Sequence, residues 1–102
     1  MTKEEATMVG FEIVAYSGDA RTKLLLALQE AKKGNFDKCE SLINEANDCL
    51  VDAHKSQTEL LQEEARGDGV EVGFITVHAQ DLLMTTMLLK DVMDTLVDIY
   101  RK

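Results

Sequence analysis

The chain has 102 residues, which gives room for one domain of ordinary size. Its 11 lysine and arginine residues against 19 aspartate and glutamate residues leave a formal charge of −8. Such an acidic surface repels phosphate backbones and anionic lipids, so we expect no nucleic-acid binding, no direct membrane insertion and a basic partner. The longest apolar run has five residues, Leu24 to Leu28, whereas a membrane span needs about twenty. Residues 1–5 show no secretory signal, which predicts a cytoplasmic protein.

The first long segment, about residues 3–33, has apolar residues at helical spacing, and no proline interrupts it. The predicted inward rows are Met8, Phe11, Ala15, Ala20, Leu24, Ala27 and Ala31, with Val9, Ile13 and Tyr16 beside them. Gly34 suits the position that ends a helix, and Asn35 suits the N-cap of the next one. Gly10 and Gly18 each cost about 1 kcal/mol relative to alanine inside a helix, and close approach of another helix would offset that cost.

Two further segments, about residues 35–66 and 73–101, repeat apolar residues at alternating steps of three and four. The predicted inward row of the second segment is Phe36, Cys39, Ile43, Ala46, Leu50, Ala53, Gln57 and Leu60. The predicted row of the third is Ile75, His78, Leu82, Thr85, Leu89, Val92, Leu96 and Ile99. Because both connections are short, neighbouring helices run antiparallel. We therefore predict an all-α, up-down-up three-helix bundle that forms a single domain over residues 1–102.

The third segment is apolar around its whole circumference between Asp81 and Lys90. Six of the eight residues from Leu82 to Leu89 are apolar, and the other two are threonines. Packing against two helices covers only part of that circumference. We therefore expect self-association through this helix, and the alternative is a ligand groove or a partner-binding face.

Two cysteines and one histidine suit structural roles. Cys39 and Cys49 would lie about 15 Å apart on one helix, too far for a disulfide, so we expect two buried, reduced thiols. His54 has no nucleophile or metal ligand near it in the sequence, and we expect a hydrogen-bonded core residue. The chain has no P-loop, dinucleotide fingerprint or zinc-protease motif. A small acidic bundle with one candidate nucleophile suits a group carrier better than a complete enzyme.

His78 is the first candidate for chemistry, because it lies about one turn into the third helix, after the glycines of residues 67–73. A helix N-terminus favours added negative charge such as a phosphoryl group, and its dipole keeps an imidazole neutral and nucleophilic. A packed core histidine is the alternative. Asp81 points to roughly the same side as His78 and leads into the apolar run. If self-association buries it, symmetry-related carboxylates meet and require protonation or a divalent cation.

Three separated blocks resemble one protein family in order and spacing. They are the stretch GFEIVAYSGDAR of residues 10–21; then Glu45-Ala46, Ala53-His54 and Ser56-Gln57-Thr58; and Val77-His78-Ala79-Gln80-Asp81 with Leu83-Met84-Thr85-Thr86. On these blocks the chain resembles enzyme IIA of the lactose/cellobiose (N,N′-diacetylchitobiose) family of the bacterial sugar phosphotransferase system. The similarity spans nearly the whole chain, and the first block is closest to the lactose branch. One departure is Leu82, where many members carry a second histidine.

The resemblance implies a homotrimer of three-helix bundles that acts as a phosphohistidine carrier. His78 would accept a phosphoryl group from phospho-HPr and pass it to a cysteine of a cognate enzyme IIB, for uptake of a β-linked disaccharide such as lactose or cellobiose. Gln80 matches a glutamine that supports the phosphorylation site. Asp81 matches an aspartate that meets its two symmetry mates around a metal ion, taken as Mg²⁺, on the trimer axis.

Two other functions are open to the same sequence. One is a non-catalytic helical adaptor or scaffold in which His78 is structural. The other is a bundle that stores metal or binds a cofactor, which needs several inward carboxylates and histidines, whereas the chain offers Asp81 and two histidines. No residue reports on the sugar, because an enzyme IIA contacts proteins and not the saccharide.

Overall fold

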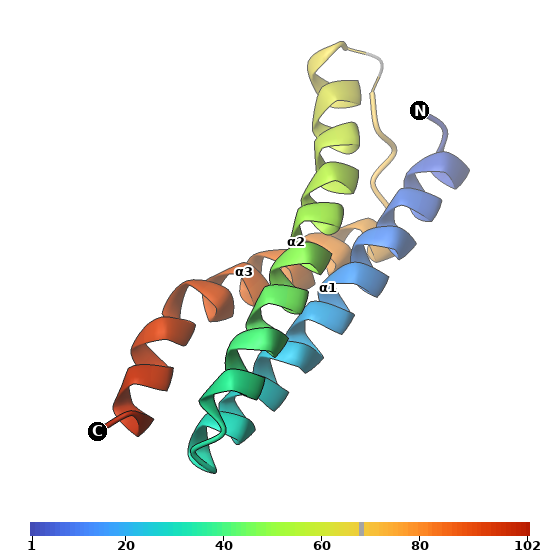
Figure 1. The fold of residues 1–102 in the computed structure, drawn as a ribbon. Coiled ribbons are helices and arrows are strands. Elements are labelled where there is room, and N and C mark those ends of the chain that lie inside the picture. The colour runs from blue at the N-terminus through green and yellow to red at the C-terminus, as the bar shows by residue number, and fades with distance from the viewer. Residues whose placement is uncertain (68) are drawn as a thin grey trace.

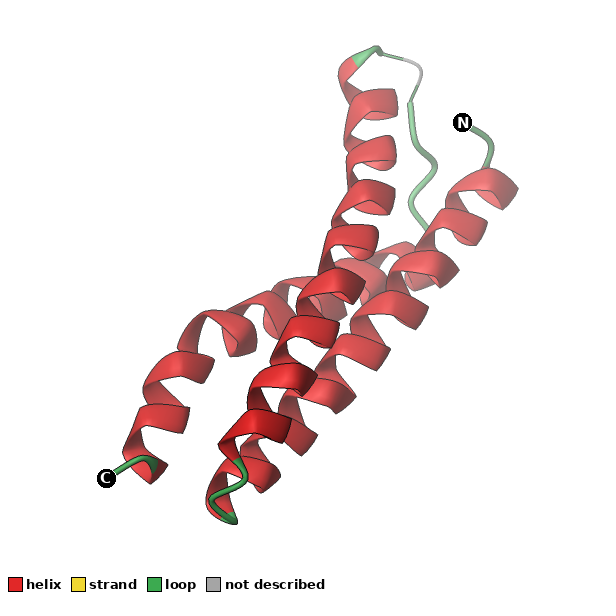
Figure 2. Ribbon diagram, viewed as in Figure 1, coloured by secondary structure: helices red, strands yellow, loops and turns green. Residues whose placement is uncertain are grey.

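The computed structural model describes residues 1–67 and 69–102, and they form three helices and no strand. The helices are α1 (Lys3–Lys32), α2 (Phe36–Ala65) and α3 (Phe74–Tyr100), as Figures 1 and 2 show. Each end lies within one residue of the predicted segments 3–33, 35–66 and 73–101. The molecule measures 52 × 19 × 18 Å, as expected when long helices run side by side. The predicted all-α bundle is confirmed.

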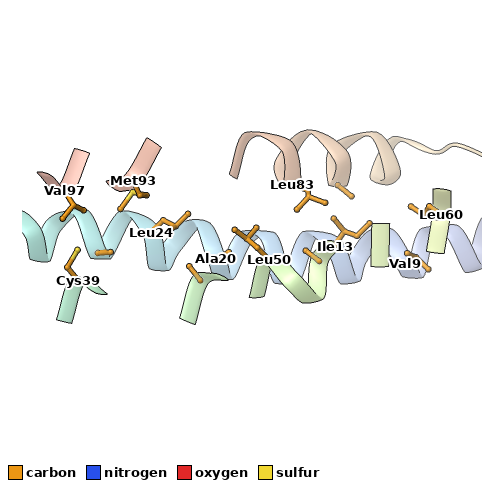
Figure 3. Packing of buried hydrophobic residues seen from close by; sticks show 14 of the residues in the cluster. Val9, Ile13, Ala20, Leu24, Cys39, Leu50, Leu60, Leu83, Met93 and Val97 are labelled. Atoms are coloured by element: carbon orange, nitrogen blue, oxygen red, sulfur yellow. The ribbon is translucent and has the colours of Figure 1, made fainter. Parts of the chain in front are cut away.

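The first helix is the one on which the other two pack. α1 and α2 run antiparallel along their whole length, whereas α3 packs mainly on α1 and has few contacts with α2. One side of α3 is therefore open along its length. The C-terminal half of α3 keeps its contact with the core through Met93 and Val97, which are both buried (Figure 3).

The helix ends follow local rules. Thr2 caps α1: its Oγ1 accepts from the Glu5 N–H at 3.1 Å, and the Glu5 carboxylate accepts from the Thr2 N–H at 2.9 Å. Gly34 has φ +82° directly after α1, which confirms its role as the residue that ends the helix. Asn35 occupies the N-cap position of α2 as predicted, but its side chain does not cap that helix. Its Nδ2 instead donates to Glu30 at 2.9 Å.

The core lies along α1 and contains small and branched apolar side chains. Figure 3 shows Leu83 of α3 above Ile13 of α1 and Met93 above Leu24, with Leu50 and Cys39 of α2 on the other side. The predicted row of α2 is buried or half-buried throughout. In α1 the prediction holds in part: most of the row is buried, but Met8, Phe11, Ala15 and Tyr16 are exposed.

The predicted row of α3 holds in part. Its residues Ile75, Leu82, Leu89 and Leu96 are half-buried, whereas His78, Thr85, Val92 and Ile99 are exposed. The fully buried residues are Thr76, Ala79, Leu83, Thr86, Met93 and Val97, each one position after a predicted one. Periodicity alone does not select the buried face, because α3 is apolar on every side between Leu82 and Leu89.

The two cysteines differ in environment. Cys39 is buried as predicted, and Cys49 is half-buried; both are free thiols. The Cys49 Sγ lies 3.4 Å from the carboxylate of Asp19, which also pairs with Lys23 at 3.0 Å. Burial raises the pKa of both thiols, and the Asp19 carboxylate adds to the rise at Cys49. Both side chains are therefore protonated and poorly nucleophilic at neutral pH.

Gly10 and Gly18 provide a matched stability prediction. A Cβ added at Gly10 would lie 3.3 Å from Ile75 Cγ2, so Gly10 marks the close approach of α1 and α3, whereas one added at Gly18 has no atom within 4 Å. Gly18→Ala should raise the free energy of unfolding by about 1 kcal/mol through helix propensity. Gly10→Ala gains the same propensity but crowds Ile75. Its free energy of unfolding should therefore be lower than that of Gly18→Ala by about 1–3 kcal/mol. Urea unfolding of both variants measures the difference, and equal stabilities would contradict the close approach.

Candidate functional site

His78 lies in the second turn of α3 and its side chain is exposed. The turn before it is fixed by Thr76, whose buried hydroxyl accepts from the Gly73 N–H at 2.9 Å and donates to the Gly73 carbonyl at 2.8 Å. The first backbone bond of the helix runs from the Val77 N–H to the same carbonyl at 3.3 Å. The segment that carries His78 is thus held rigidly although the imidazole itself is accessible.

The N–H groups of Phe74, Ile75 and Thr76 have no hydrogen-bond partner in the described part of the chain. They are the free donors that every helix presents at its N-terminus, and they carry the positive end of its dipole. Side chains in a helix lean toward the N-terminus, so the His78 imidazole leans over this turn. A negatively charged group on its outer nitrogen would lie near these donors and be stabilised by them.

Gln80 points away from His78. Two positions along a helix differ by about 200° in direction. The Gln80 Oε1 accepts a hydrogen bond from Nε2 of Gln57 in α2 at 2.7 Å. Gln80 also borders a hollow of about 440 Å³ between the end of α2, the loop and α3, formed largely by Leu60, Leu61, Val70, Val72 and Val77. Within one chain, Gln80 and His78 therefore lie on different sides of α3.

Asp81 is exposed and stands in the middle of an apolar stripe on the open side of α3. Apart from Tyr100 at its last position, the exposed large hydrophobic residues of this helix are Phe74, Val77, Met84, Leu88, Val92 and Ile99. They precede or follow Asp81 by 7, 4, 3, 7, 11 and 18 residues, which places all of them on its face. We call this surface the α3 stripe. Phe74 at its start is 91% exposed and Leu88 is 64% exposed.

No metal site is complete in one chain. Within residues 1–67 and 69–102, no three His, Cys, Asp or Glu side chains come close enough to hold an ion. Asp81 likewise has no ion pair among these residues. At this position one chain therefore supplies a single carboxylate.

The prediction for His54 is wrong, because this residue is exposed. It borders a second hollow between α2 and α3, together with Lys55, Lys90 and Met87. Its neighbour Ala53 is fully buried, so the outward direction of His54 follows from which face of α2 meets α1, which the spacing of a single helix does not reveal. The sequence analysis did not assign Gln57 to the site. Its place in the apolar row correctly predicted burial, and its amide and its position in the block Ser56-Gln57-Thr58 were the available signals of a polar partner.

Comparison with known proteins then decides the family. Residues 8–101 match the family described as "PTS system, Lactose/Cellobiose specific IIA subunit". The chain belongs to this family. The lactose-specific EIIA component of Streptococcus mutans serotype c is 56% identical over 102 residues, which cover all of this chain and 98% of the relative.

Solved structures agree with this assignment. The crystal structure of PtcA from S. mutans matches with a TM-score of 0.95 and 42% identity over the whole of both chains. The IIA(Chitobiose)–HPr complex of the Escherichia coli phosphotransferase system matches with a TM-score of 0.80 and 30% identity, covering 94% of this chain and 93% of that one. The IIA fold is therefore shared by relatives named for different sugars. In the described part of this IIA chain, no helix is long and apolar enough to cross a bilayer.

Proposed function

We propose that this IIA chain is a phosphohistidine carrier in which His78 accepts a phosphoryl group from phospho-HPr and passes it to a cysteine of an enzyme IIB. The observation that carries the proposal is an exposed imidazole in the second turn of α3, next to the free N–H groups that begin the helix. The structural relative solved with HPr supports the donor. The charge of −8 suits a basic donor surface and predicts an encounter that weakens with salt.

Each transfer exchanges one bond to phosphorus for another. In the first, the N–P bond of the donor histidine breaks as an N–P bond to His78 Nε2 forms, and each ring keeps the proton on its other nitrogen. In the second, a thiolate of enzyme IIB attacks phosphorus, an S–P bond forms, and His78 leaves as a neutral imidazole. Neither step needs a further reactant, so catalysis consists of positioning and charge stabilisation.

We further propose that the chain forms a homotrimer through the α3 stripe. A row of six large exposed hydrophobic residues is costly for a monomer in water and is typical of an interface. Because Asp81 stands in the middle of the stripe, three-fold packing on this face brings three carboxylates together at the axis.

The trimer would also complete the site at His78. Seen along α3, His78 lies about 60° to one side of Asp81 and Gln80 about 100° to the other. If Asp81 faces the axis, cyclic symmetry turns the His78 side of one copy toward the Gln80 side of the next. Gln80 would then support the phosphoryl group on a neighbouring copy, although it points away from His78 of its own chain.

The residues at this axis fit a divalent cation, which we propose to be Mg²⁺. Three Asp81 carboxylates offer oxygen ligands, the type that this hard ion prefers, and among the described residues no lysine or arginine pairs with Asp81. When bound, the ion would cancel the repulsion among the carboxylates. Leu82 follows Asp81 here, so no histidine is available from that position.

The S. mutans relative, named lactose-specific, supports a β-linked disaccharide such as lactose as the transported sugar. We also propose a cytoplasmic location, where phosphoenolpyruvate supplies the phosphoryl groups. The sugar itself would not touch this chain.

Labelling tests the carrier against a non-catalytic adaptor. Incubation of the wild-type chain with ³²P-phosphoenolpyruvate, enzyme I and HPr should give one phosphoryl group per chain. The adduct should be lost in acid and stable in alkali, as expected of phosphohistidine. Omission of HPr is the control and should leave the chain unlabelled. Absence of label in the complete mixture would favour the adaptor.

A further inference from the structure

We propose that Gln57 is a positioning residue for phosphoryl transfer, acting through the amide of Gln80 on His78 of a neighbouring copy. This inference rests on the proposed carrier function and trimer. It starts from one contact: the hydrogen bond from Gln57 Nε2 to Gln80 Oε1, at 2.7 Å, is the single side-chain hydrogen bond between α2 and α3 in the described residues.

The bond fixes which end of the Gln80 amide is free. Gln57 is only 8% exposed, so its amide is enclosed and approaches Gln80 from one direction. Because Gln80 Oε1 is occupied, its NH₂ group is directed elsewhere, and it has no protein acceptor among the described residues. An amide NH₂ donates to a phosphoryl oxygen, whereas the amide oxygen would repel it.

The same bond fixes the start of α3 in space. α3 has few contacts with α2, and next to Gln80 the two helices are separated by the hollow of about 440 Å³. The Gln57–Gln80 hydrogen bond therefore links two helices that are loosely packed against each other at this point. A donor group displaced by about 1 Å loses much of its effect on a transfer reaction, so this link has a direct influence on rate.

Kinetics of the trimeric protein with ³²P-phospho-HPr test the proposal. Gln57→Met keeps the side-chain length but removes the amide, and it should lower the maximal rate of transfer about tenfold with little change in half-saturating HPr concentration. Gln80→Met should act similarly, and the double variant should be no slower than the slower single one. The matched control is Ser56→Ala, which removes the adjacent α2–α1 hydrogen bond to Glu12 (3.1 Å) and should keep the wild-type rate.

Mixed trimers test whether the action crosses between copies. Gln57→Met chains are dissociated and reassembled with an excess of His78→Ala chains, which cannot be labelled but carry an intact Gln57–Gln80 pair. The rate per remaining His78 should then return toward the wild-type value, because most neighbours now present an oriented amide. A rate that stays low would overturn action on a neighbour, and a wild-type rate in Gln57→Met trimers would overturn the positioning role.

Two further measurements keep these outcomes interpretable. If Gln57→Met does not fold, Gln57→Asn replaces it in the test. Its side chain is polar but one methylene shorter, so it cannot reach Gln80, and it should show the same loss of transfer rate. Sedimentation and labelling of the wild-type chain come first. If the wild-type trimer is labelled and both Gln57 variants transfer normally, only this inference fails; an unlabelled or monomeric wild-type chain overturns the proposed function and this inference together.

Discussion

His78→Ala should take up no acid-labile phosphate from phosphoenolpyruvate, enzyme I and HPr, whereas the wild-type chain takes up one group. The variant lacks the imidazole beside the free N–H groups of Phe74, Ile75 and Thr76, and the other histidine, His54, lies on α2. Because His78 is exposed, the substitution removes no core packing, and the free energy of unfolding should stay within about 0.5 kcal/mol of wild type.

His54→Ala is the matched control, since His54 is also exposed and is the only other histidine. It lies on α2 beside Lys55, away from the start of α3, and should be labelled like the wild-type chain. Both variants remove one accessible imidazole, but only the imidazole of His78 stands at a helix N-terminus. A difference in labelling between them therefore reports on the position of the imidazole. Label on His78→Ala, or loss of label in His54→Ala alone, would contradict the assignment of the acceptor.

The sequence was sufficient for the fold where one face of a helix is distinct from the others. α2 alternates apolar and charged residues so clearly that its inward row is correct from Phe36 to Leu60. Gly34 and Gly73 stand at helix ends, and Gly34 has the positive φ of +82° that favours glycine, so these residues mark the boundaries within one residue.

The faces of α3 were beyond prediction for a physical reason. Its middle turns are apolar on all sides, so the buried side is the one that packs on α1. That choice is made by tertiary packing and cannot be read from the sequence period. The sequence predicts His78 as the candidate acceptor because a helix N-terminus, with its free N–H groups and dipole, favours a phosphoryl group on a nearby imidazole. The sequence places Gln57 in the apolar row and in a block that resembles the family, but it does not pair residues 57 and 80, because that hydrogen bond depends on how two helices meet.

Asp81→Leu should give a trimer that is independent of metal and more stable than the wild-type one. In the proposed wild-type trimer, the three carboxylates at the axis would repel one another unless a cation neutralised them. Leucine removes the charge and continues the α3 stripe. The free energy of trimer dissociation should therefore rise by about 1–4 kcal/mol. Sedimentation with and without a chelator measures this: chelation should dissociate the wild-type trimer at low protein concentration and leave Asp81→Leu assembled.

Asp81→Asn completes the test, because it removes the charge but keeps the size and polarity of the side chain. If repulsion is what the cation offsets, Asp81→Asn should also assemble without metal, but less tightly than Asp81→Leu because its amides stay buried among apolar residues. If instead the carboxylates hold the trimer together through the ion, both variants should fall apart into monomers. Dissociation of Asp81→Leu would therefore reject the account of axial repulsion while leaving the phosphoryl acceptor at His78 to be judged by its own labelling.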